Sequence, residues 1–181
     1  MLKVISGGQT GVDRGALDAA LALGVECDGW CPGGRLAEDG LIPERYPVME
    51  LASAGYAERT AQNVSDSDGT LVISKGEPFG GTRETVDRCV EMRKPYLLID
   101  YARVAIDDAI ELTLKFADTL SSRAAQTTPG MTIVLNVAGP RASQWPEGHE
   151  IAEQIVSGVL RRLVDRTTRV NTVRDSPRGD P

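Results

Sequence analysis

The chain has 181 residues and a net charge of −6, with 41% apolar and 25% charged residues, which suits a single globular domain. The acidic balance argues against nucleic-acid binding, and no apolar run approaches the ~20 residues that a membrane span requires. The first residues lack the pattern of a signal peptide. We therefore expect a cytoplasmic protein that binds neither nucleic acid nor membranes. Cys27, Cys31, Cys89 and the single His149 make a poor zinc set, so no metal site is predicted.

Short apolar runs alternate with helical patterns along the chain. The expected strands and helices, in chain order, are strand 2–6, helix 12–23, strand 25–30, helix 56–64, strand 70–74, a helix from 80, strand 96–99, a helix from 106, strand 132–137 and helix 151–163. Residues 31–47, rich in Gly and Pro, are expected to form a long loop.

This alternation predicts an α/β fold, Rossmann-like, with three α/β/α layers and a mostly parallel sheet of about five or more strands. Residues 1–163 form the single ligand-binding domain. Residues 164–181 lose the apolar periodicity and are expected to form a flexible C-terminal tail.

In an open parallel sheet, ligands bind beyond the carboxyl ends of the strands. Glycine-rich segments follow the first and third expected strands, and a Gly-Pro break that displays an arginine follows the last. Such loops let a phosphate approach helix amide groups. The first could instead be only a tight turn, Thr82 in the second only a helix N-cap, and Arg141 after the last strand only a solvated loop residue. Neither standard nucleotide-binding loop is present. The candidate ligand-binding residues are Gly7, Gly8, Gln9, Thr10, Gly11, Asp13, Arg35, Ser74, Lys75, Gly80, Gly81, Thr82, Glu84, Asn136, Gly139 and Arg141.

Two of these candidates are carboxylates, which would repel a phosphate. Asp13 could simply stabilise the helix dipole. It could also accept hydrogen bonds from an amino group and a neighbouring ring N–H, as guanine or a pterin presents. Glu84 could act in the same way, or as a first-turn acid of its helix.

Five segments in this order resemble the molybdenum carrier family, a branch of the SLOG-type Rossmann-like proteins. The segments are GGQTGVDRGALDAAL, GWCPGGRLAEDGLIPERYPVMEL, AERTAQNVSDSDGTLVI, GGTRETVD and LNVAGPRAS, within about residues 1–163. The resemblance implies a protein that binds, stores and transfers molybdenum cofactor, a phosphate-bearing pterin, without chemical turnover. It also implies molybdoenzymes as recipients and a homodimer or homotetramer.

The chain is more distantly similar to phosphoribohydrolases that cleave nucleoside monophosphates. In their P-G-G-x-G-T-x-x-E pattern the last Glu is catalytic, and this position falls on Thr85. Glu84 is one residue early, a rotation of about 100° on a helix. A hydrolase of the N-glycosidic bond, with Glu84 or Asp13 as the acid, is therefore the alternative function.

Overall fold

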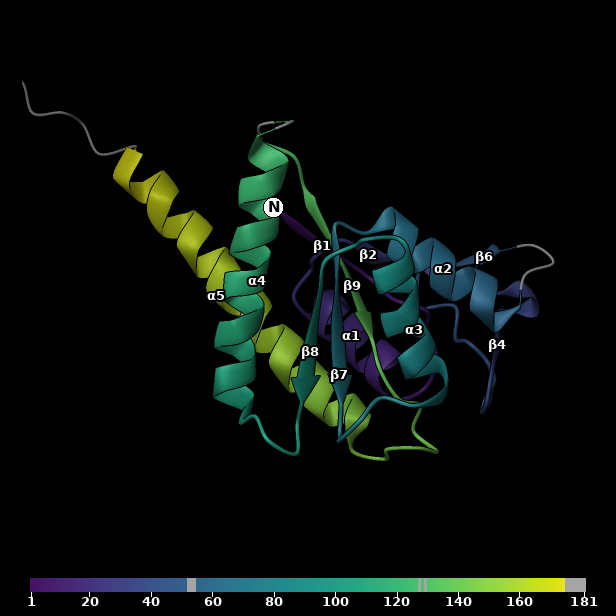
Figure 1. The fold of residues 1–181 in the computed structure, drawn as a ribbon. Helices are drawn as coiled ribbons and strands as arrows, with labels where there is room; N and C mark the ends of the chain where they lie inside the picture. Colours follow the sequence, from purple (N-terminus) through teal and green to yellow (C-terminus); the bar gives the residue numbers. More distant parts are fainter. Residues whose placement is uncertain (52–54, 127, 129, 175–181) are drawn as a thin grey trace, which may run out of the picture.

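The computed structural model describes residues 1–51, 55–126, 128 and 130–174, with side chains described through residue 166. Within these residues, five strands form one parallel sheet (Figure 1). They are β1 (Leu2–Ile5), β2 (Cys27–Asp28), β7 (Gly69–Ser74), β8 (Tyr96–Asp100) and β9 (Ile133–Ala138). The strand order is β2-β1-β9-β7-β8, so the last strand in sequence lies at the centre of the sheet.

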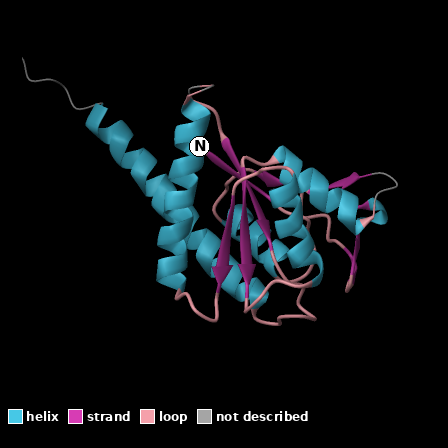
Figure 2. Ribbon diagram, in the orientation of Figure 1, coloured by secondary structure: helices cyan, strands magenta, loops and turns pink. Residues whose placement is uncertain are grey.

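Helices cover both faces of this sheet (Figure 2). They are α1 (Val12–Ala22), α2 (Tyr56–Asp66), α3 (Gly80–Glu91), α4 (Ile106–Ala125) and α5 (Gly148–Arg174). Helices α1 and α4 pack against α5, whereas α2 packs against α3. All six residues of β7 are buried, as expected for a strand covered on both faces. The predicted Rossmann-like α/β fold with a parallel sheet is confirmed.

Two clusters of buried side chains hold the layers together. The larger one joins α1, α4 and α5 to the sheet through residues such as Val4, Leu71 and Leu135. The smaller one lies on the outer side of α1 and consists of Leu17, Cys31, Ile42, Tyr46 and Val48.

The expected loop at 31–47 contains more structure than its composition indicates. It holds a short 3-10 helix, η1 (Gly33–Arg35), and a hairpin of β4 (Leu36–Ala37) and β5 (Gly40–Leu41). At its two ends, β3 (Trp30–Pro32) pairs in parallel with β6 (Met49–Leu51). The strand expected at 25–30 is therefore divided between β2 and β3, because the chain leaves the central sheet at Gly29.

Helix α5 continues past Leu163 to Arg174, so the first part of the expected tail is helical. Residues 175–181 of that tail lie outside the described residues. That the tail is flexible and dispensable stays a prediction. No helix in the described part of the chain is both long and apolar enough to cross a membrane.

Candidate functional site

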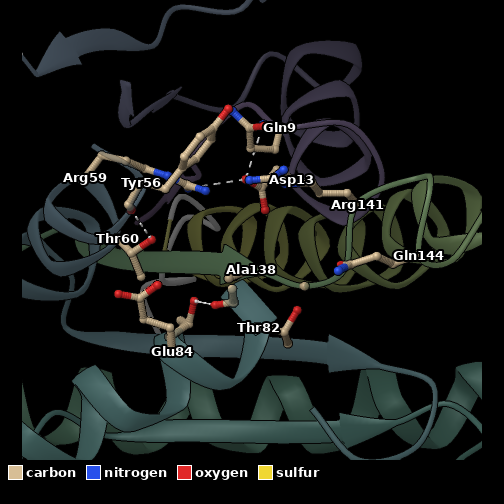
Figure 3. Close-up of a pocket in the computed structure, with 13 residues that line it drawn as sticks. Gln9, Asp13, Tyr56, Arg59, Thr60, Thr82, Glu84, Ala138, Arg141 and Gln144 are labelled. Carbon is tan, nitrogen blue, oxygen red and sulfur yellow. Dashed lines mark hydrogen bonds and ion pairs between the residues drawn. The ribbon is translucent and has the colours of Figure 1, made fainter. Parts of the chain in front are cut away.

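A cavity of about 200 Å³ lies where three strands end (Figure 3). The segments after β1, β7 and β9 and one face of α2 supply its walls. Its lining residues are Gln9, Asp13, Tyr56, Arg59, Thr60, Gly81, Thr82, Glu84, Thr85, Ala138, Gly139, Arg141 and Gln144. The chain runs from β1 to β2 at one edge of the sheet, and from β7 to β8 at the other edge. The cavity thus lies at the topological switch point, where open α/β sheets bind ligands.

Asp13, in the first turn of α1, forms a buried acidic wall of the cavity and is only 4% exposed. The Gln9 backbone N–H donates to its Oδ2 over 3.3 Å, and Arg59 Nη1 lies 3.6 Å from the same oxygen. Burial raises the pKa of the Asp13 carboxyl, against the opposing charges of Arg59 and Arg141. The site therefore holds a carboxyl group that can accept hydrogen bonds when ionised and donate one when protonated.

Gly7 gives Arg59 the space to reach this carboxylate. A Cβ at position 7 would lie 1.7 Å from Arg59 Nη1 and 2.9 Å from Asp13 Oδ2. The guanidinium group of Arg59 thus occupies the space that a side chain at position 7 would fill.

Gly8, Thr10 and Gly11, in the same segment after β1, do not line the cavity but pack against neighbouring segments. Gly8 has φ +71°, and a Cβ there would lie 3.3 Å from Ile42, in the smaller core cluster. A Cβ on Gly11 would lie 2.4 Å from the Pro140 carbonyl oxygen. Thr10 accepts a hydrogen bond from the Ala142 backbone N–H and donates to Glu38. These contacts fix the segment after β1 against the segment after β9.

The start of α3 forms the opposite wall. Thr82 is 3% exposed, and its Oγ1 has no hydrogen-bond partner among the described residues. The space beside Gly81 is open, with no atom within 4 Å of a Cβ built there. First-turn amide groups have no partner within their own helix and favour an anion. Thr85, at the position of the hydrolase glutamate, donates its hydroxyl to the Gly81 carbonyl over 3.0 Å.

Two arginines and a tyrosine complete the cavity. Arg141 Cζ lies 4.5 Å from the centre of the Tyr56 ring, and Arg59 Cζ lies 6.0 Å from it. Figure 3 shows the Tyr56 side chain beside Arg59, near Asp13. Arg59 Nε is buried and has no partner among the described residues. Two positive charges therefore face a cavity that also contains carboxylates.

The structure brings about half of the candidate residues to this cavity. Those that line it are Gln9, Asp13, Gly81, Thr82, Glu84, Gly139 and Arg141. Ser74 Oγ donates to the Gly76 carbonyl, Lys75 is exposed, and Asn136 Nδ2 donates to Thr70 Oγ1 inside the sheet. Gly80 precedes the lining residues of α3.

Arg35 also lies outside the cavity lining. Its guanidinium group donates to the backbone carbonyl groups of Ile42, Pro43, Tyr46 and Val48. It therefore orders the 31–47 loop. Its N–H groups are already used by these carbonyl oxygens and are not free to bind an anion.

Tyr56, Arg59, Thr60 and Gln144 line the cavity but are not among the candidates. Three of them lie on α2, and its position beside β9 follows from the folded chain rather than from any local pattern. The available signal was the segment AERTAQN, which contains Arg59 and Thr60 and forms part of the family resemblance. Among the described residues, no group of three or more His, Cys, Asp or Glu side chains could hold a metal ion.

Comparison with known proteins gives one family and one solved structure. Residues 4–160 match the circularly permutated YpsA SLOG family. The crystal structure of a "putative molybdenum carrier protein" from Syntrophus aciditrophicus SB superposes with a TM-score of 0.80 at 41% sequence identity, covering 88% of this chain and 95% of that chain. No curated protein matches. The family resemblance seen in the sequence is confirmed, and the chain belongs to the circularly permutated YpsA SLOG family.

Proposed function

We propose that this chain binds molybdenum cofactor, a pterin that carries a phosphate group, and transfers it chemically unchanged. The observation that carries the proposal is the cavity at the switch point, which is lined by an open helix start, by two arginines and by the buried acceptor residues Gln9 and Asp13. The name of the Syntrophus aciditrophicus SB protein supports a carrier role.

The polar groups of the cavity fit the two ends of such a ligand. A phosphate group would bind at the start of α3, with the unpartnered Thr82 hydroxyl and the guanidinium of Arg141 as donors. The pterin would lie against Gln9 and Asp13, which offer hydrogen-bond acceptors.

The size of the cavity suits a ligand that is only partly enclosed. Pockets that bury most of a drug-sized ligand measure roughly 300–1,000 Å³, whereas this cavity measures about 200 Å³. Part of the cofactor would therefore remain outside, where a recipient molybdoenzyme could contact it. Partial enclosure favours transfer over permanent retention.

One observation favours the alternative function, hydrolysis of an N-glycosidic bond. Asp13 lines the cavity with a pKa raised by burial, the property that a general acid needs near neutral pH. The position of the hydrolase glutamate, however, holds Thr85, whose hydroxyl donates to a backbone carbonyl. We therefore place binding first and hydrolysis second.

Turnover separates the two functions. The purified protein is incubated with AMP and with GMP, and free base is measured by chromatography over many enzyme equivalents. In parallel, the protein is mixed with molybdenum cofactor, re-isolated and added to an apo-molybdoenzyme. Stoichiometric capture with release of active cofactor, and no free base, supports the carrier. Multiple turnovers that vanish in Glu84→Gln or Asp13→Asn would establish the hydrolase.

A further inference from the structure

We infer that the cavity recognises one particular ring edge, the sequence of amino group, ring N–H and oxo group that pterins share with guanine. This inference rests on the proposed function and names the chemistry by which the ligand is selected. It is carried by three polar residues that line the cavity, Gln9, Asp13 and Arg59 (Figure 3). Gln9 Oε1 and Arg59 Nε are buried and have no hydrogen-bond partner among the described residues.

Gln9 presents an acceptor whose orientation is fixed by its neighbour. Its Nε2 donates to the Leu36 carbonyl over 2.9 Å, so the other end of the amide must be the oxygen. A flipped amide would bring two carbonyl oxygens together and lose this hydrogen bond. The residue is 2% exposed, and Oε1 has no partner among the described residues. A buried acceptor without a donor costs free energy. A ligand N–H would recover this free energy once the side chains that cover Oε1 move slightly aside.

Asp13 supplies a second acceptor among the residues that line the cavity. Its carboxylate is tied to the backbone of Gln9 by the hydrogen bond from the Gln9 N–H to Oδ2. The two acceptors therefore come from one turn of chain and belong to the same wall. A carboxylate and an amide oxygen in one cavity attract N–H donors and repel a ring nitrogen with a lone pair.

Arg59 supplies the donor that completes the pattern. Its Nε–H is buried and unpartnered in the described part of the chain, while its Nη1 lies 3.6 Å from Asp13. The wall thus offers two acceptors and one donor. The amino-oxo edge offers two donors and one acceptor, so the two sets match in number and kind. Adenine offers one donor and one acceptor, and xanthine offers one donor between two acceptors.

Four nucleoside monophosphates test this inference because they share the phosphate and differ at the ring edge. GMP carries the full edge, IMP lacks the amino group, XMP replaces it with an oxo group, and AMP presents a ring acceptor. By titration calorimetry, we expect GMP to bind most tightly and IMP to bind ~10-fold or more weakly, since one hydrogen bond to a charged or buried acceptor is lost. AMP and XMP are expected to bind most weakly.

Pterin and lumazine repeat the comparison without a phosphate, because lumazine replaces the 2-amino group of pterin with an oxo group. Pterin should bind and lumazine should bind ~10-fold or more weakly. Equal affinities within both series would overturn the inference. A failure of every nucleotide and of pterin to bind would also overturn it.

A variant and a matched control assign the selectivity to this wall. Gln9→Leu removes the oriented acceptor at similar size and should bring the GMP and IMP affinities together. Gln62→Leu makes the same change on the exposed side of α2, where Gln62 contacts Asp66, and should leave the GMP preference intact. Circular dichroism and the melting temperature check the fold of both variants. A preference for GMP that survives in folded Gln9→Leu would contradict the assignment.

Capture of molybdenum cofactor is measured separately with the same preparations. Capture together with equal nucleotide affinities would leave the carrier function standing and remove only the selectivity for the ring edge. A strong GMP preference with no capture of the cofactor would support the ring-edge inference and overturn the carrier function.

Discussion

Arg59 reaches Asp13 only because residue 7 has no side chain. The guanidinium group passes through the volume that a Cβ would occupy, and it lies 3.6 Å from the carboxylate. At the scale of single residues, the charge balance of the cavity therefore depends on a glycine that lies behind it.

Gly7→Ala tests this dependence. The added Cβ would displace the Arg59 guanidinium and leave the Asp13 carboxylate without its counter-charge. Since the clash is with the end of a flexible side chain, we expect a folded protein that is destabilised by about 1–3 kcal/mol at neutral pH. Thermal unfolding measures the loss.

The effect of this variant should depend on pH in a defined direction. Burial raises the pKa of Asp13 above its ordinary 3.8 in the folded state, so its contribution to stability is present below 3.8 and is lost as pH rises through the raised pKa. Without Arg59 that pKa rises further. The stability difference between Gly7→Ala and wild type should thus be small near pH 4 and grow toward pH 8. A constant difference across this range would refute the mechanism.

Arg141→Ala tests the proposed anion contact at the cavity mouth. Hydrogen bonds to a charged group contribute about 1.5–3 kcal/mol, so we expect roughly 10- to 100-fold weaker binding of GMP at low salt. Arg161→Ala, an exposed arginine on α5, is the control and should bind as wild type does. Unchanged affinity in Arg141→Ala would show that this arginine only stacks on Tyr56.

At the scale of elements, the β4–β5 hairpin is attached to the segments that build the cavity. Glu38, near its tip, accepts hydrogen bonds from Thr10 and from the Ser143 backbone N–H and hydroxyl. Its neighbour Asp39 forms a bidentate pair with Arg14 over 2.6 and 2.8 Å. The hairpin, which is part of the loop at 31–47, is thus attached to the segments that follow β1 and β9.

Glu38→Gln should loosen this hairpin in a pH-dependent way. Although burial acts to raise it, the hydrogen bonds from Ser143 and Thr10 lower the pKa of Glu38 below its ordinary 4.5. The stabilisation is therefore present above pH 4.5 and is lost as pH falls through the lowered pKa. Because the side chain is exposed, we expect an effect of about 1 kcal/mol or less.

Hydrogen exchange of the hairpin amides at pH 7 and pH 3 measures this effect. Exchange in Glu38→Gln should exceed wild type at pH 7 and approach it at pH 3. Glu44→Gln, an exposed change in the same loop, is the control. Faster exchange in Glu44→Gln to the same extent would show that the hairpin does not depend on Glu38.

The end of α5 is expected to be dispensable. From Arg166 onward, the described contact with the body is an exposed ion pair to Asp118 at 3.2 Å. Such pairs contribute roughly 0–1 kcal/mol, so removal of residues 166–181 should lower the melting temperature by no more than about 4 °C. Differential scanning calorimetry of the truncated protein measures this shift. A larger drop would mean that the tail packs on the domain or on a second copy.

The order and kind of the major elements could be predicted from the sequence because apolar periodicity is local. The strand at 70–74 and the helix from Val12 follow from their own residues. The β4–β5 hairpin could not, since it is attached through Glu38 to Thr10 and Ser143, which are distant from it in sequence. Part of the candidate site could not be predicted for the same reason. Arg59 faces the cavity because α2 packs beside the central sheet. The residue spacing within α2 does not indicate this packing.

At the scale of the whole molecule, the proposed ligand would connect parts of the chain that are distant in sequence. The cavity walls come from α2, α3 and the segments after β1 and β9. A ligand that binds only the folded state at 100 times its Kd stabilises by about 2.7 kcal/mol. We therefore expect saturating GMP to raise the melting temperature by about 5–10 °C. Arg141→Ala should reduce this rise, and a wild-type melting temperature that stays unchanged at saturation would contradict binding at this cavity.

The central position of β9 has a consequence for synthesis of the protein. Leu2 in β1 pairs with Ile133 in β9, so the first strand has no inner neighbour until most of the chain has left the ribosome. Parallel contacts of such long sequence separation form slowly, because much of the chain must be ordered before they stabilise it. Polypeptides that stop before residue 133 would also lack the segment that supplies Gly139 and Arg141 to the cavity. Nascent chains are therefore expected to lack a complete cavity, and so to bind no ligand there, until translation is almost complete.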